Sequence, residues 1–272
     1  MSSSTINNHH SEPEASAPVI LAVDTSTARP AMAIRCAADL LAALVSSRVE
    51  PHSRTLFDNL NLLLEQAALT IDEIDLFAVV TGPGSFTGLR VGISALTGLA
   101  AARGRPLCGI DRLELQARAL GCAGTILVLS EAGRGEVYAG LRRLDAAGSV
   151  TSPAGDLYGP PAAVMTPLLA QLDPVELSRL LITGDAVERV HPILTQLARE
   201  SSQPLSVAIL TSARSGGWQV VLPDDPLVFQ LARTVSHLHH TAGVAGLPPC
   251  IPFYVRPSDA EINWQNHDAH AI

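Results

Sequence analysis

Three glycines in the first third of the chain have the spacing and context of an anion-binding turn. Gly82, Gly84 and Gly88 lie in the segment T-G-P-G-S-F-T-G-L-R, which follows an apolar run and precedes small residues at helical spacing. A strand, a glycine-rich turn and a helix start bring unpaired N–H groups and a positive dipole end together. Such a turn, with Ser85, could hold a phosphate, or it could let the helix pack closely on the sheet.

A dinucleotide-binding turn is the most specific form of this hypothesis. Asp111 ends the next predicted strand, where a ribose-binding acid would lie. However, the spacing G-x-G-x-x-x-G departs from the dinucleotide fingerprint, and Pro83 removes one N–H group from the turn. Leu89 and Arg90 follow Gly88 where a Walker A loop has Lys and Ser or Thr. The sequence therefore favours a packing turn.

The hydroxyl-rich turn D-T-S-T at residues 24–27 is a second candidate. Asp24, Thr25 and Ser26 have the chemistry to hold nucleotide phosphates and a metal ion. Arg29 and Pro30 stand where a glycine would let a phosphate approach the backbone. We therefore favour the alternative, a hairpin turn closed by its own side chains.

The remaining polar clusters give weaker signals. Glu131 and Arg134 lie in S-E-A-G-R-G-E-V-Y, which reads as a hairpin with a surface ion pair. His237 and His240 are three residues apart on a predicted helix, but the sequence has neither H-E-x-x-H nor H-x-x-x-H. No G-x-S-x-G nucleophile motif occurs. We expect neither a metal site nor a catalytic residue.

Hydrophobic periodicity predicts the elements that must position these groups. The predicted strands cover 19–23, 31–35, 40–46, 76–80, 106–110, 125–129, 137–144, 148–152, 180–183 and 205–209. The predicted helices cover 56–68, 86–103, 113–120, 192–199 and 226–241. Three strands followed by helix, strand, helix and strand is the half-domain order of the actin/hexokinase/Hsp70-like (ASKHA) superfamily, and the second half begins similarly.

The sequence thus predicts an α/β fold of two duplicated lobes. We assign residues 1–17 to a disordered tail, 18–120 to an N-terminal lobe, 121–257 to a C-terminal lobe and 258–272 to a loose tail.

Composition narrows the class of protein. The 272 residues are 47% hydrophobic, enough for a large core, and the net charge of -8 is unusual for a protein that binds nucleic acid alone. The four cysteines are scattered, and neither a signal-peptide pattern nor an apolar run long enough to span a membrane is present. We expect a cytoplasmic protein without membrane contact.

One predicted helix is a candidate for a protein interface. The 86–103 helix is rich in small residues, and glycine inside a solvent-facing helix costs about 1 kcal/mol relative to alanine. Close approach of another element, internal or from a partner, explains these glycines. The candidate interface residues on this helix are Arg90, Gly92 and Ser94.

The central motif resembles the bacterial TsaB (YeaZ) family. The residues that carry the resemblance are Gly82, Pro83, Gly84, Ser85, Phe86, Thr87 and Gly88, with Glu136 and Tyr138 of G-E-V-Y and the later Y-V-R-P at 254–257. Glu131 and Gly133 depart from the family's usual D-A-R-x-G-E-V-Y. The match is dense from about residue 19 to 144.

The resemblance implies a non-catalytic subunit that supports TsaD, which transfers a threonylcarbamoyl group to the adenosine beside the tRNA anticodon. It also implies that the 86–103 helix and the 54–69 helix contact TsaD or a second copy of the chain, with Leu56, Leu60 and Leu63 as candidates for the contact face. A TsaE-like ATPase would be a further partner, and tRNA would be reached only through the complex. No cofactor is required, although ATP or ADP could bind. The alternatives are an ATP-dependent phosphotransferase or ATPase, with Asp24 and Glu131 near the metal, and a peptidase.

Overall fold

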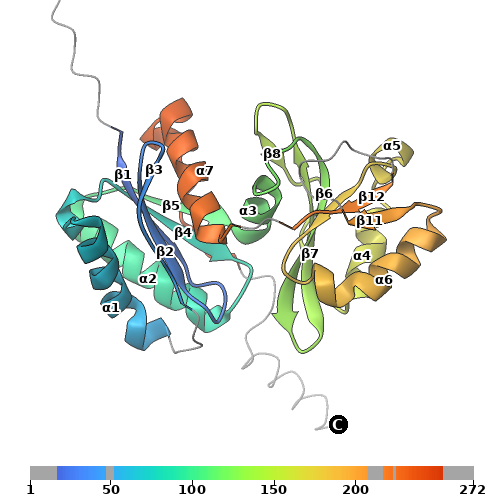
Figure 1. The fold of residues 1–272 in the computed structure, drawn as a ribbon, viewed down its shortest axis with the longest axis horizontal. Helices are drawn as coiled ribbons and strands as arrows, with labels where there is room; N and C mark the ends of the chain where they lie inside the picture. Colours follow the sequence, from blue (N-terminus) through green and yellow to red (C-terminus); the bar gives the residue numbers. More distant parts are fainter. Residues whose placement is uncertain (1–16, 47–51, 208–216, 223–224, 254–272) are drawn as a thin grey trace, which may run out of the picture.

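The computed structural model describes residues 17–46, 52–207, 217–222 and 225–253. The predicted tails and the Y-V-R-P motif at 254–257 lie outside these ranges, apart from Ala17. Two lobes stand side by side with α3 (Arg112–Arg118) between them (Figure 1). None of the helices in the described ranges has the length and apolar character needed to cross a membrane.

The first lobe is built on a five-stranded sheet of order β3-β2-β1-β4-β5. Its strands are β1 (Val19–Asp24), β2 (Ala31–Cys36), β3 (Asp39–Val45), β4 (Leu76–Gly82) and β5 (Leu107–Asp111). The first three form an antiparallel meander, and β4 and β5 join β1 in parallel. This is the order that the sequence predicts for the half-domain.

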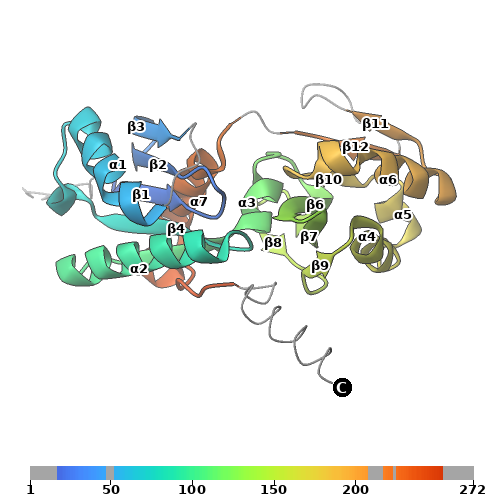
Figure 2. The same ribbon diagram turned by 90° about the horizontal axis from the view of Figure 1, so that it is seen from below.

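Both faces of the first sheet are covered, because successive side chains of a strand point to opposite sides. Leu21 and Val23 of β1 join the apolar cluster under α1 (His52–Ala67) and α2 (Phe86–Arg103). Ile20 and Ala22 join the cluster under α7 (Leu227–Ala242). Figure 1 shows α1 and α2 on one side of the first sheet and α7 on the other, and Figure 2 gives the view turned by 90°.

The second lobe has a seven-stranded sheet of order β11-β12-β10-β6-β7-β8, with β9 also paired to β7. Its strands are β6 (Gly124–Gly133), β7 (Glu136–Leu144), β8 (Val150–Thr151), β9 (Leu157–Gly159), β10 (Leu181–Thr183), β11 (Leu205–Val207) and β12 (Trp218–Val220). The remaining helices are α4 (Pro161–Leu169), α5 (Pro174–Leu177) and α6 (Val187–Glu200), with single 3-10 turns at 71–73 and 244–246. The two-lobed α/β fold agrees with the prediction.

The helix α7 belongs to a different lobe from the one that the sequence predicts. The prediction counts the 226–241 helix with the C-terminal lobe, whereas α7 packs on the first sheet. Val228, Leu231 and Val235 are fully buried there. The apolar stripe of α7 identifies a buried face, but a stripe alone does not tell which sheet it covers.

Candidate functional site

The glycine-rich turn and the hydroxyl-rich turn pack against each other. The N–H of Ser85 donates to the carbonyl oxygen of Ser26 at 2.7 Å. A Cβ atom at Gly84 would lie 2.3 Å from that same oxygen, so only glycine fits there. The hydroxyl of Ser85 also caps α2 by accepting from the N–H of Gly88 at 3.2 Å. The turn therefore uses Gly84 and the N–H groups of Ser85 and Gly88 for contacts within the chain.

Gly92 has an internal role as well. A Cβ atom at Gly92 would lie 2.2 Å from Oγ1 of Thr25 and 3.1 Å from its Cγ2. Gly92 therefore lets α2 lie directly on the 24–27 turn, and its assignment to a partner interface is corrected. By contrast, a Cβ at Gly98 would meet nothing within 4 Å.

The leucines predicted for the interface are also core residues. Leu56, Leu60 and Leu63 of α1 are 3%, 5% and 0% exposed, and all three pack against the first sheet. The prediction is wrong here because the stripe at helical spacing is the face that α1 buries. On the outer faces lie Ser94 and Arg90, whose guanidinium carbon is 3.8 Å from the centre of the Phe86 ring.

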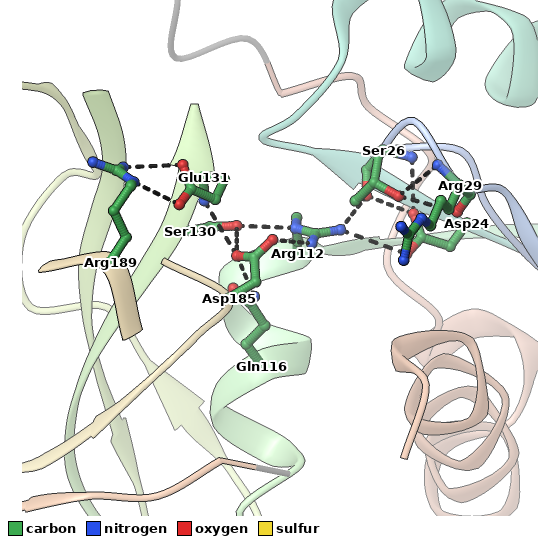
Figure 3. A network of polar contacts seen from close by, with 10 residues as sticks. Asp24, Ser26, Arg29, Arg112, Gln116, Ser130, Glu131, Asp185 and Arg189 are labelled. Carbon is green, nitrogen blue, oxygen red and sulfur yellow. Dashed lines mark hydrogen bonds and ion pairs between the residues drawn. The ribbon is translucent and has the colours of Figure 1, made fainter. Parts of the chain in front are cut away.

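A polar network joins the two lobes at the end of β1 (Figure 3). Asp24 is buried, and its Oδ1 accepts from the N–H of Ser26 at 2.8 Å and from the Ser26 hydroxyl. Its Oδ2 lies 3.6 Å from Nη1 of Arg112, which also donates to Ser26. Arg112 begins α3 and its side chain is only 7% exposed. The acid of the D-T-S-T turn therefore faces an arginine of its own chain.

The same arginine binds the second lobe. Its Nε donates to the hydroxyl of Ser130 in β6 at 3.1 Å. Its Nη2 lies 3.0 Å from Oδ2 of Asp185, which follows β10. Ser130 and Gln116 donate to the other oxygen of Asp185, at 2.7 and 3.2 Å. Burial raises the pKa of Asp185, but the charge of Arg112 and these hydrogen bonds outweigh it and keep that pKa below its usual value.

The side chain of Glu131, the acid proposed for the second hairpin, points away from this network, while its backbone N–H donates to Asp185 at 3.2 Å. Both of its carboxylate oxygens bind Arg189, at 2.7 and 3.0 Å (Figure 3). Arg189 also donates to the carbonyl oxygens of Gly135 and Glu136. Glu131 therefore closes its own hairpin. The second-lobe acid beside Asp24 is Asp185.

The other motif residues of the second hairpin lie in β7. The carboxylate of Glu136 accepts from the hydroxyl of Tyr158, and Tyr138 is 3% exposed with its ring centre 5.6 Å from that of Tyr158. Both motif side chains are thus engaged within the second lobe.

Asp111, the candidate ribose-binding acid, is used in another way. Its Oδ1 caps α3 by accepting from the N–H of Glu114 at 2.6 Å. The same oxygen accepts from Nη2 of Arg142 at 2.8 Å, and Arg142 also binds Asp156 at 2.7 Å. Burial lowers the pKa of Arg142, but the hydrogen bond to Asp156 and the charges of both acids raise it above its ordinary value. A second buried arginine therefore ties β5 to the second lobe.

The two histidines considered as metal ligands lie on the helix that the sequence predicts. His237 and His240 are both exposed on α7. Within the described ranges, no three side chains of the His, Cys, Asp and Glu types come together as a metal-binding group.

Arg112 and Asp185 are absent from the residues singled out in the sequence. One signal could have identified Arg112. A cation in the first turn of a helix is disfavoured by the positive end of the helix dipole. An arginine directly after the cap Asp111 therefore indicates an acidic partner nearby. Asp185 carries a weaker signal, as an acid that follows Thr183 and Gly184 at a strand end.

Comparison with known proteins places these features in a family. Residues 41–214 match the family described as "TsaD: tRNA N6-adenosine threonylcarbamoyltransferase". An uncharacterized protein of Mycobacterium tuberculosis is 36% identical over 123 residues, which cover 44% of this chain and 56% of that protein. The Bacillus subtilis tRNA threonylcarbamoyladenosine biosynthesis protein TsaB is 30% identical over 123 residues, 45% of this chain and 54% of that protein. The chain thus spans about half the length of these relatives.

A solved structure shares the fold. YeaZ from Pseudomonas aeruginosa aligns with a TM-score of 0.56 and 23% identity, covering 85% of this chain and 98% of that one.

Proposed function

The chain belongs to the TsaD (tRNA N6-adenosine threonylcarbamoyltransferase) family and is TsaB-like, and on this premise we propose that it is the non-catalytic partner of a TsaD enzyme. In this role it takes part in the synthesis of threonylcarbamoyladenosine in tRNA. It binds the catalytic subunit and keeps it in an active arrangement.

The outer face of α1 and α2 carries this proposal. Phe57 and Leu62 of α1 are 53% and 45% exposed, although both are large and apolar. The neighbouring face of α2 exposes the small residues Ser94, Gly98 and Ala101. Exposed large apolar side chains on one helix and exposed small residues on another suit close packing of helices from a second protein. We define these five residues as the docking face.

The acids near the junction of the lobes support a non-catalytic role. Asp24 and Asp185 bind Arg112, Asp111 binds Arg142, and Glu131 binds Arg189. Each of these acids is committed to an ion pair within the chain. The net charge of -8 suggests that the partner supplies most contacts to tRNA phosphates. A TsaE-like ATPase remains a further proposed partner, and a second copy of the chain would compete for the docking face.

Size-exclusion chromatography with light scattering tests the proposal. The chain is mixed at micromolar concentration with the TsaD homologue of its own organism. Phe57→Asp, Leu62→Asp and Ser94→Arg place charge or bulk on the docking face. Val175→Asp is the matched control, because Val175 is 65% exposed on α5 of the other lobe.

We expect a one-to-one complex with the wild-type chain and with Val175→Asp, and loss of the complex with the three docking-face variants. Reconstituted threonylcarbamoyl transfer to tRNA should follow the same order. Circular dichroism shows whether each variant is folded. A wild-type chain that forms no complex, or docking-face variants that bind normally, would contradict the proposal.

A further inference from the structure

The junction between the lobes is already filled by a cation of the chain itself. Arg112 lies between Asp24, at the end of β1, and Asp185, after β10 (Figure 3). Its three nitrogens reach Ser26, Ser130 and both carboxylates, so the guanidinium has partners in both lobes. The phosphotransferase alternative would put a metal ion and nucleotide phosphates here, beside Asp24.

We infer that Arg112 is a built-in latch: its guanidinium occupies the place of a metal–nucleotide group and holds the two lobes in one arrangement without a ligand. The residues present do not fit such a group, because its position is filled by a positive charge with the acids already paired. A fork of fixed donors suits this task, since arginine stays charged and can bind several oxygens at once.

The two ends of the latch differ in burial. Asp24 and Arg112 are 8% and 7% exposed at their side chains, whereas Asp185 is 40% exposed. Loss of Arg112 would leave the Asp24 carboxylate buried without a cation, which is strongly destabilising. Loss of Asp185 would remove a partner that water can partly replace. The buried end therefore anchors the arginine to the first lobe, and the exposed end is where the lobes separate first.

A second arginine supports the same reading. Arg142 of β7 crosses the junction in the opposite direction and binds Asp111, at the end of β5, while it is held by Asp156. The lobes are thus joined by one arginine from each side. A cleft that opened and closed around a ligand would have to break both of these arginine contacts between the lobes in every cycle.

Hydrogen–deuterium exchange of the intact chain tests the latch. Two amides report on the two lobes: the N–H of Ser26, which donates to Asp24, and the N–H of Ala186, which donates to the carbonyl oxygen of Leu129. Arg112→Gln keeps a polar side chain without the charge. Arg189→Gln removes an arginine that binds only within the second lobe, and serves as the control.

We expect Arg112→Gln to speed exchange at both amides by about tenfold or more, because an unpaired buried charge favours the open state. Asp185→Asn should speed both by a smaller factor, and the double variant should show less than the product of the two effects. Arg189→Gln should leave Ser26 unchanged. Should Arg112→Gln fail to fold, Arg112→Lys and Asp185→Asn carry the same comparison.

Two results would overturn the inference. One is faster exchange in Arg112→Gln that is confined to α3, with both reporter amides unchanged, since the arginine would then act only locally. The other is calorimetric binding of Mg-ADP to the wild-type chain at micromolar concentration with protection of the 24–27 turn. In contrast, millimolar guanidinium that restores slow exchange in Arg112→Ala, and not in Arg189→Ala, would support it.

Discussion

Two glycines of the same helix should respond in opposite ways to one added methyl group. In an exposed helix, Gly→Ala is worth about 1 kcal/mol of stability. Gly98 is exposed and has open space around its Cβ position, so Gly98→Ala should gain that amount. Gly92 has the same helical propensity to gain, but its new Cβ would overlap Thr25.

The size of the penalty follows from the contacts. The new methyl would lie 2.2 Å from Oγ1 of Thr25, with Cγ2 at 3.1 Å and Cβ at 3.2 Å. Rotation of the short threonine side chain cannot clear all three atoms, so α2 or the 24–27 turn must shift. Overpacking of this kind costs about 1–3 kcal/mol. Because the propensity gain is common to both variants, Gly92→Ala should be less stable than Gly98→Ala by about that penalty.

Urea denaturation of the isolated chain, followed by circular dichroism, measures the difference. Thr25→Ala provides the cross-check, because Oγ1 of Thr25 has no hydrogen-bond partner among the described residues and its removal relieves the overlap. Gly92→Ala should therefore cost less in the Thr25→Ala background. If Gly92→Ala stabilises the wild type as much as Gly98→Ala does, the close packing of α2 on the 24–27 turn is refuted.

Three further changes test the ion pairs. Arg142→Met should cost about 3–5 kcal/mol in urea denaturation, because it leaves Asp111 and Asp156 without their buried cation; a loss below about 1 kcal/mol would contradict that account. The pKa of Asp185 is lowered in the folded chain, so its ionised form adds stability above the unfolded pKa, and this stability is lost as pH falls through the folded pKa. The difference in free energy of unfolding between wild type and Asp185→Asn should therefore narrow as pH falls from about 5 to about 3. A constant difference would argue against the pairing. Arg189→Ala should cost less than about 1 kcal/mol in the same assay, because the pair is solvent-exposed, and a larger loss would mean that the second hairpin depends on it.

Most of the local elements could be predicted from the sequence because alternation and helical spacing are visible within a few residues. The helices α4 and α5 and the strands β9 and β12 were not predicted, because they are short or lie among prolines. Nothing local specifies where α7 docks, since Val228, Leu231 and Val235 would suit either sheet. The site follows the same rule. Asp24 and Ser26 were visible as a hydroxyl-rich turn, whereas the partner that gives them their role, Arg112, is 86 residues from Ser26 in sequence. Long-range pairing of charges has no period that a single sequence displays.

The return of α7 to the first sheet has a consequence for synthesis on the ribosome. Ile20, Ala22, Ala78 and Val80 face the cluster that α7 closes, so this apolar surface stays open until residue 242 has left the ribosome. The second lobe, in effect an insertion into the first, can fold before its host is complete. Expression of residues 18–120 alone should therefore yield an aggregating fragment, while a segment from 121 to 222 has its own core. The first lobe starts earlier in the sequence, but the second lobe is expected to become stable before it.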